Sequence, residues 1–248
     1  MNNIALVTGA SRGIGAATAL RLASDGFDVC VNFLNNEHAA KSIVKKIESM
    51  GAKAIAVQAD IAKQNQVEHL FQVVDNELGR LNALINNAGI LLPQSRLVDM
   101  DETRINQILT TNVTGYFLCC KEAIKRMSTS FGGNGGTIVN VSSAASRLGS
   151  AGEYIDYAAS KGAIDTLTIG LSKEIATQGV RVNCVRPGLI YTDIHADGGE
   201  PERVNRLKDQ LPLQRGGQAS EVAAAIAWLA SKESSYTTGA FIEVSGGI

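Results

Sequence analysis

The sequence lacks the features of a membrane, secreted or nucleic-acid-binding protein. Its 248 residues carry 23 Lys and Arg against 24 Asp and Glu, so the formal net charge of −1 gives no general attraction to phosphate backbones or anionic lipid. No apolar run approaches the ~18 residues of a membrane-spanning helix, and the start Met1-Asn2-Asn3-Ile4 has no basic segment typical of a signal peptide. These absences predict a cytoplasmic protein with neither a nucleic-acid nor a membrane partner.

Cysteine and histidine are scarce as well. The four cysteines contain no Cys-x-x-Cys pair and each lies in an apolar stretch, which predicts buried free thiols rather than disulfides or a redox centre: Cys30, Cys119, Cys120 and Cys184. The three histidines are too far apart in the sequence to suggest a zinc site: His38, His69 and His195. We therefore expect no metal.

Short apolar runs alternate with amphipathic stretches along the whole chain. The runs that predict strands are rich in Val, Ile and Ala: 4–8, 28–33, 53–58, 83–86, 137–142, 181–186 and 240–244. The helical patterns between them cover 13–25, 37–50, 64–78, 103–127, 155–178 and 219–231, where Ser220 is the expected N-cap of the last helix. This alternation predicts an α/β fold with a doubly wound, seven-stranded parallel sheet and helices on both faces.

No segment has the composition of an interdomain linker, so we expect one domain over residues 1–248. The stretch 193–217 breaks the alternation, because it combines glycines, prolines and mixed charges directly after a strand. We interpret it as an excursion over the edge of the sheet, where α/β folds place loops that cover a ligand.

A glycine-rich turn follows the first predicted strand and leads into a helix: Thr8-Gly9-Ala10-Ser11-Arg12-Gly13-Ile14-Gly15. Glycine lets the backbone approach a ligand closely, and a helix N-terminus favours an anion such as a pyrophosphate. The spacing differs from the common Gly-x-Gly-x-x-Gly fingerprint, and an ordinary flexible loop is the alternative. The position after the first strand favours dinucleotide binding.

A tyrosine and a lysine stand four residues apart at the start of a long predicted helix. Of the five tyrosines, only Tyr157 has a lysine at this spacing, Lys161. Side chains at i and i+4 share a helix face, and a nearby ammonium lowers the pKa of a phenol, which makes it a proton donor and acceptor. A surface lysine on an amphipathic helix explains the pair equally well. Upstream, Ser142 and Ser143 end a predicted strand, where a serine either contacts a ligand or caps a loop.

Together these motifs resemble the short-chain dehydrogenase/reductase family from end to end, and they are similar to those of 3-oxoacyl-[acyl-carrier-protein] reductases and bacterial glucose dehydrogenases. The matching segments are Thr8–Gly15, Asp60-Ile61, Asn86-Asn87-Ala88-Gly89, Asn112, Ser143 with Tyr157 and Lys161, Pro187-Gly188, and Thr238-Gly239 with Gly246-Gly247. The resemblance implies a Rossmann-type sheet, an oxidoreductase activity and a homotetramer.

The resemblance also implies a role for each matching residue. Tyr157 is the expected general acid/base, Lys161 its partner and a ligand of the nicotinamide ribose, Ser143 the holder of the reacting oxygen, and Asn112 the support of a water-linked relay to Lys161. Ser143 lies fourteen residues before Tyr157, where the family usually has thirteen, so Ser142 remains the alternative. The expected cofactor-binding residues are Tyr157 and Lys161 together with Gly9, Ser11, Arg12, Gly13, Ile14, Gly15, Asp60, Ile61, Asn87, Ala88, Gly89, Pro187, Gly188, Ile190 and Thr192.

The resulting prediction is an NADP(H)-dependent enzyme that interconverts a ketone and a secondary alcohol of a small-molecule substrate. NADP(H) is preferred to NAD(H) because no carboxylate follows the second strand before Glu37, and because Arg12 can meet a 2′-phosphate. The alternatives are an NAD-preferring sugar or polyol dehydrogenase, and a non-catalytic dinucleotide sensor. The residues expected to line the substrate pocket are Glu153, Tyr154, Tyr191 and His195.

Overall fold

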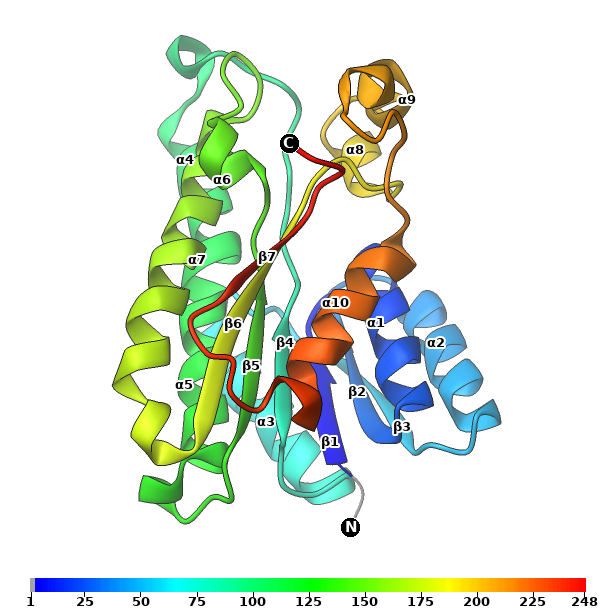
Figure 1. Cartoon of the computed structure of the whole chain (residues 1–248), viewed down its shortest axis with the longest axis vertical. Coiled ribbons are helices and arrows are strands. Elements are labelled where there is room, and N and C mark those ends of the chain that lie inside the picture. The colour runs from blue at the N-terminus through cyan, green and yellow to red at the C-terminus, as the bar shows by residue number, and fades with distance from the viewer. Residues whose placement is uncertain (1–2) are drawn as a thin grey trace.

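Seven parallel strands form one sheet through the centre of the computed structural model, which describes residues 3–248 (Figure 1). The sheet order is β3-β2-β1-β4-β5-β6-β7. The strands are β1 (Asn3–Val7), β2 (Phe27–Phe33), β3 (Ala54–Gln58), β4 (Ala83–Asn86), β5 (Gly136–Val141), β6 (Val180–Pro187) and β7 (Phe241–Val244). The predicted fold class is confirmed, with each strand within a few residues of its expected range.

Helices cover both faces of this sheet, which explains why its central strands are almost continuously apolar. One face packs against α1 (Gly13–Ser24), α2 (Glu37–Ser49) and α10 (Ala219–Ala230). The other packs against α3 (Gln64–Glu77), α5 (Gly115–Met127) and α7 (Ile155–Glu174). Figure 1 shows these two helical layers on either side of the strands. The four cysteines are buried free thiols, as predicted.

The predicted helix 103–127 is interrupted. It consists of α4 (Glu102–Leu109), a π-helical turn at Thr110–Thr114, and α5. Single π-helical turns inside α-helices are frequent at functional sites, and this one carries Asn112. The apolar pattern missed it because one wider turn hardly disturbs the helical period.

Two other helix ends differ from the prediction. The α-helix predicted over 155–178 ends at Glu174, and residues Ala176–Gln178 form a separate 3₁₀ turn. The N-cap of α10 is Gln218 rather than Ser220, because the Glu221 carboxylate accepts a hydrogen bond of 2.8 Å from the Gln218 N–H. This capping box places the cap at Gln218, and the helix starts at Ala219, as in the predicted range 219–231.

The excursion at 193–217 contains two short helices, α8 (Ile194–Asp197) and α9 (Arg203–Leu207). Its base is closed by a parallel bridge between Ile190 and Gly217. In Figure 1 it rises at the same end of the sheet as α6 (Ala145–Leu148), beyond the carboxyl ends of the strands. Ligand sites of open α/β sheets lie at this edge. Within residues 3–248, no helix is both long and apolar enough to cross a membrane.

The packing of α10 on the sheet gives a test of the fold. Ile226 is fully buried in the core on that face, whereas Ile169 on α7 is 43% exposed. We expect Ile226→Ala to lower the free energy of unfolding by about 2–5 kcal/mol because it leaves a cavity, and Ile169→Ala to change it by about 1 kcal/mol or less. Equilibrium urea unfolding measures both values, and equal losses would contradict this packing.

Candidate active site

A cavity of about 560 Å³ lies at the carboxyl edge of the sheet. It is lined by residues from the loops that follow β1 to β6 and by part of the excursion. Most of the catalytic and cofactor-binding residues expected from the sequence line this cavity: Gly9, Ser11, Arg12, Gly13, Ile14, Asp60, Ile61, Asn87, Ala88, Gly89, Ser143, Tyr157, Lys161, Pro187, Gly188, Ile190 and Thr192. Of the expected catalytic and cofactor-binding residues, Gly15 and Asn112 do not line it.

The glycine-rich turn has a backbone that other residues could hardly adopt. Gly9 and Gly13 have φ values of +61° and +56°, and a Cβ on Gly9 would lie 2.9 Å from the Cα of Ala88. Helix α1 begins at Gly13, and within the described chain no side chain caps its first turn. Its N–H groups therefore face the cavity without a side-chain partner, an arrangement that fits the pyrophosphate of a dinucleotide.

Gly15 acts through packing instead of by lining the cavity. A Cβ there would lie 2.5 Å from both Asn87 Nδ2 and the Gly9 carbonyl oxygen. The absence of a side chain lets the start of α1 approach the loop after β4. Gly15 thus belongs to the frame of the turn.

Thr8 joins the turn to the loop after β4. Its Oγ1 accepts hydrogen bonds from the N–H groups of Asn87 (2.9 Å) and Ala88 (3.0 Å), and Asn87 Nδ2 donates to the Thr8 carbonyl (2.9 Å). Asn32 on β2 provides a second tie, because it accepts from the Gly9 N–H (3.2 Å) and donates to the Ala59 carbonyl (3.0 Å). The sequence analysis missed Asn32, although an amide within an apolar strand was the available signal.

Lys161 lies fully within the protein interior, one helical turn after Tyr157 on α7. Its Nζ donates to the Val141 carbonyl (2.9 Å) and to the Tyr116 hydroxyl (3.4 Å). The same Nζ is 5.6 Å from the centroid of the Tyr157 ring. Burial lowers the pKa of Lys161 to about 8, because the ammonium loses its hydration.

Burial acts on Tyr157 in the opposite sense, since it raises the pKa of the phenol to about 12. A hydrogen bond with Ser143 offsets part of this rise. The sequence predicted that the Lys161 ammonium would lower the pKa of Tyr157. That direction is wrong for this structure, because the loss of water around the phenolate outweighs the other effects.

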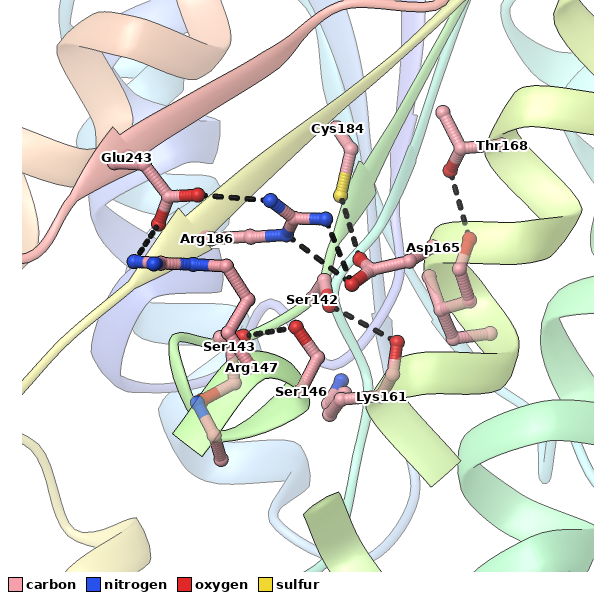
Figure 2. A network of polar contacts seen from close by, with 12 residues as sticks. Ser142, Ser143, Ser146, Arg147, Lys161, Asp165, Thr168, Cys184, Arg186 and Glu243 are labelled. Atoms are coloured by element: carbon pink, nitrogen blue, oxygen red, sulfur yellow. Dashed lines mark hydrogen bonds and ion pairs between the residues drawn. The ribbon is translucent and has the colours of Figure 1, made fainter. Parts of the chain in front are cut away.

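The structure separates the two candidate serines. Ser142 is buried and its Oγ donates to the Lys161 carbonyl (3.1 Å), as Figure 2 shows. Ser143 accepts from the Ala145 N–H (3.1 Å) and hydrogen-bonds to Tyr157. The structure therefore brings Ser143, not Ser142, to the tyrosine.

Asn112 supports the cavity from behind. Its Oδ1 accepts from the Ile90 N–H (2.8 Å), and its Nδ2 donates to the Ile90 carbonyl (3.0 Å) and to Ser160 Oγ (3.3 Å). Among the described residues, Lys161 is not one of its hydrogen-bond partners. A Cβ on Gly89 would lie 3.4 Å from Asn112 Oδ1 and 3.6 Å from Lys161 Nζ, so the absence of a side chain at Gly89 leaves space between them.

The nucleotide end of the cavity has no carboxylate at the end of β2. This part is lined by Asn32, Leu34, Asn35 and Asn36 together with Arg12. Arg12 forms an exposed ion pair with Asp197 of α8, which joins the turn to the excursion.

The substrate end is lined by two of the four nominated residues. Tyr154 donates from its hydroxyl to the Gly198 carbonyl (3.0 Å), and His195 Nε2 donates to the Ile190 carbonyl (3.0 Å). Glu153 and Tyr191 lie outside the lining, where Glu153 pairs with Arg203 and Tyr191 donates to Asn205 (3.1 Å). The lining residues that the sequence analysis missed include Leu91, Leu148, Ser150, Ile194, Arg203 and Ile248, for which no local motif exists.

The comparisons with known proteins agree with this geometry. Residues 9–248 match a family model described as "Enoyl-(Acyl carrier protein) reductase". The 3-oxoacyl-[acyl-carrier-protein] reductase of Staphylococcus aureus is 36% identical over 248 residues, which cover 100% of this chain and 98% of that protein. The chain belongs to the short-chain dehydrogenase/reductase family. It is an oxidoreductase of that family, as the sequence predicted.

Other members of the family are similar over nearly their full length. An "uncharacterized oxidoreductase" of Escherichia coli K12, YgfF, is 62% identical over 244 residues, covering 98% of this chain and 99% of that protein. A short-chain dehydrogenase of Burkholderia cenocepacia, solved in complex with NADP, superposes with a TM-score of 0.91 at 33% identity and covers 99% of this chain and 97% of that one. A blue fluorescent protein from a metagenomic library, solved with NADPH, has the same TM-score at 34% identity and the same coverage.

The Thr8 hydroxyl generates a prediction about cofactor binding. We expect Thr8→Val, which keeps the shape of the side chain, to weaken NADPH binding about tenfold because it leaves two loop N–H groups without an acceptor. Thr8→Ser keeps the acceptor and is the matched control. Fluorescence titration with NADPH measures both dissociation constants, and equal values for the two variants would contradict the assigned role.

Proposed function

We propose that this enzyme interconverts a ketone and a secondary alcohol with NADP(H), with Tyr157 as the general acid/base. The observation that carries the proposal is the meeting of two hydroxyls, Ser143 and Tyr157, in the cavity beside the buried Lys161. Two adjacent hydroxyls are suited to hold one substrate oxygen. The bound cofactor supplies or accepts the hydride at the carbon that carries this oxygen.

In this mechanism the chain's own residues orient the substrate and exchange the proton. Ser143 donates a hydrogen bond to the reacting oxygen, and the Tyr157 hydroxyl gives its proton to that oxygen in reduction. Its raised pKa of about 12 keeps the phenol protonated near neutral pH, so the proton that reduction requires is present on Tyr157. In oxidation the order reverses: the Tyr157 phenol first releases its proton towards solvent through Lys161 and a relay supported by Asn112, and the phenolate then accepts the proton of the substrate hydroxyl.

The assigned cofactor residues follow the cavity from end to end. The turn from Gly9 to Ile14 binds the pyrophosphate, Asp60 with Ile61 and the 87–89 loop surround the adenosine, and the 187–192 segment holds the nicotinamide. Arg12 lines this cavity, and no carboxylate stands at the end of β2. Both features support a preference for the 2′-phosphate of NADP(H). The NADP and NADPH complexes of two solved relatives support it too.

A carbonyl is favoured over a carbon–carbon double bond as the reduced group, although the matching family model is named for an enoyl reductase. The paired hydroxyls of Ser143 and Tyr157 suit an oxygen at the reacting carbon. A 3-oxoacyl thioester is therefore the first substrate to test, as the relatives' names suggest. The homotetramer and the cytoplasmic location stay predictions.

The proton-transfer role of Tyr157 gives the central test. We expect Tyr157→Phe to lower kcat for the reduction of acetoacetyl-CoA by about 10²–10⁴-fold, because the ring stays while its exchangeable proton is lost. Binding of NADPH should remain close to that of the unmodified enzyme. Near-normal kcat in this variant, or an unmodified enzyme that reduces crotonyl-CoA and not acetoacetyl-CoA, would overturn the assignment.

Cofactor preference is tested through the ion pair of Arg12. We expect Arg12→Ala to weaken NADPH binding about ten- to a hundredfold and NADH binding much less, because only NADPH carries the 2′-phosphate. Asp197→Asn should act in the opposite sense and strengthen NADPH binding up to about fivefold, since it frees Arg12 from an exposed partner. Equal losses for both cofactors in Arg12→Ala would refute the NADP(H) preference.

A further inference from the structure

Four charged side chains are linked by ion pairs near Ser143 and Lys161, as Figure 2 shows: Arg147, Glu243, Arg186 and Asp165. At the centre of this group is Arg186 on β6, whose Nε and Nη2 both donate to Asp165 Oδ2 (3.1 and 2.9 Å) and whose Nη1 donates to Glu243 Oε1 on β7 (2.8 Å). The side chains of Arg186 and Asp165 are only 15% and 12% exposed. The guanidinium also stacks on Phe241, 4.1 Å from its centroid, so its position is closely defined.

One branch of this group reaches the acid/base helix. Asp165 lies one helical turn after Lys161 on α7, on the same face. Burial lowers the pKa of Lys161, and the neighbouring Cys184 and the Asp165 carboxylate both act in the opposite direction and raise it. The Cys184 thiol of β6 donates a hydrogen bond to Asp165 Oδ1 (3.8 Å). The cation that pairs with this carboxylate is Arg186.

The other branch reaches the segment that carries Ser143. Glu243 accepts from Arg147 Nη2 (3.2 Å) as well as from Arg186. Arg147 lies on α6, four residues after Ser143, and donates also to the carbonyl of Ile248 (2.8 Å) at the rim of the cavity. The Arg186 guanidinium is thus connected to both elements that carry the reacting hydroxyls.

We propose that Arg186 is a positioning residue for catalysis, which balances the Asp165 carboxylate behind Lys161 and holds α7 and α6 in register across the end of β6. No motif marks this residue, and it does not line the cavity. Its effect on turnover rests on the proposed function, whereas its effect on the charge of Lys161 does not. The alternative is a purely structural tie between strands and helix.

The charge-balance explanation, unlike the purely structural one, predicts a shift in the pKa of Lys161 whose sign depends on which charge is removed. The groups that face Lys161 are Tyr157 on its own helix, Tyr116 of α5, Cys184 of β6 and Asp165. Removal of the Arg186 cation leaves the Asp165 carboxylate unbalanced, so the pKa of Lys161 must rise. Removal of the carboxylate lets the pKa fall, and removal of both restores the balance.

The experiment is a ¹³Cε NMR titration of the Lys161 side chain, assigned with Lys161→Met. We expect the pKa to rise by about half a unit or more in Arg186→Met, to fall in Asp165→Asn, and to return towards the starting value in the double variant. Arg186→Lys keeps the positive charge and should titrate like the unmodified enzyme. If Arg186→Met folds poorly, the fall expected in Asp165→Asn against the unchanged titration of Arg186→Lys still tests the charge effect.

A matched control lies at the other end of the same strand. Arg181 is also half-buried on β6, but it donates to the carbonyls of Leu229, Ser231 and Thr237, far from Lys161 along the strand. Arg181→Met should lower stability without moving the Lys161 titration. Shifts of the same sign in all variants, or a shift in Arg181→Met as large as in Arg186→Met, would overturn the proposal.

Turnover provides the second measurement. We expect Arg186→Met to lower kcat for acetoacetyl-CoA about tenfold with little change in the KM for NADPH, and the double variant with Asp165→Asn to recover part of the loss because no lone charge remains buried. If the fold-loss in kcat of the double variant equals the product of the two single-variant losses, the charge-balance argument is refuted. An enzyme without turnover on carbonyl substrates would refute the proposed function and leave the NMR titration to decide the role of Arg186.

Discussion

The contact between the loop after β1 and the loop after β4 is the constraint on which the site depends. These two strands are neighbours in the sheet, so their carboxyl ends meet, and the Gly9 backbone lies against Ala88 with no space for a side chain. The Thr8 hydroxyl fixes the second loop by accepting two of its N–H groups. The turn, the start of α1 and the floor of the cavity all take their positions from this contact.

Burial gives the reacting groups their electrostatic character. The pKa of Lys161 falls to about 8 and that of Tyr157 rises to about 12, because in each case the charged form loses water. The two shifts have opposite directions yet the same effect, since both favour neutral side chains. Near neutral pH the phenol is therefore uncharged, whereas Lys161 keeps most of its charge, which the Val141 carbonyl and the Asp165 carboxylate stabilise.

Much of the fold and many residues that line the cavity could be predicted because they depend on local chemistry. Continuous Val and Ile runs indicate strands buried on both faces, and a turn such as Gly9–Gly15 permits few backbone conformations. The π-helical turn at Asn112 could not be predicted, since one wider turn leaves the apolar period intact. The pairs Arg186–Asp165 and Arg203–Glu153 could not be predicted for another reason: their members are 21 and 50 residues apart in sequence, and only the folded chain brings them together. The direction of the Tyr157 pKa was also missed, because burial is a property of the whole fold.

The bridge between Ile190 and Gly217 has a consequence for how an enzyme of this kind can acquire a different substrate specificity. Because the two ends of the excursion are joined at its base, the segment between them leaves and re-enters the core at one fixed point. The entropic cost of closing a loop grows only slowly with its length. The excursion can therefore be lengthened, shortened or rewritten without moving the strands that hold the cofactor, so that the two halves of the cavity are free to evolve at different rates.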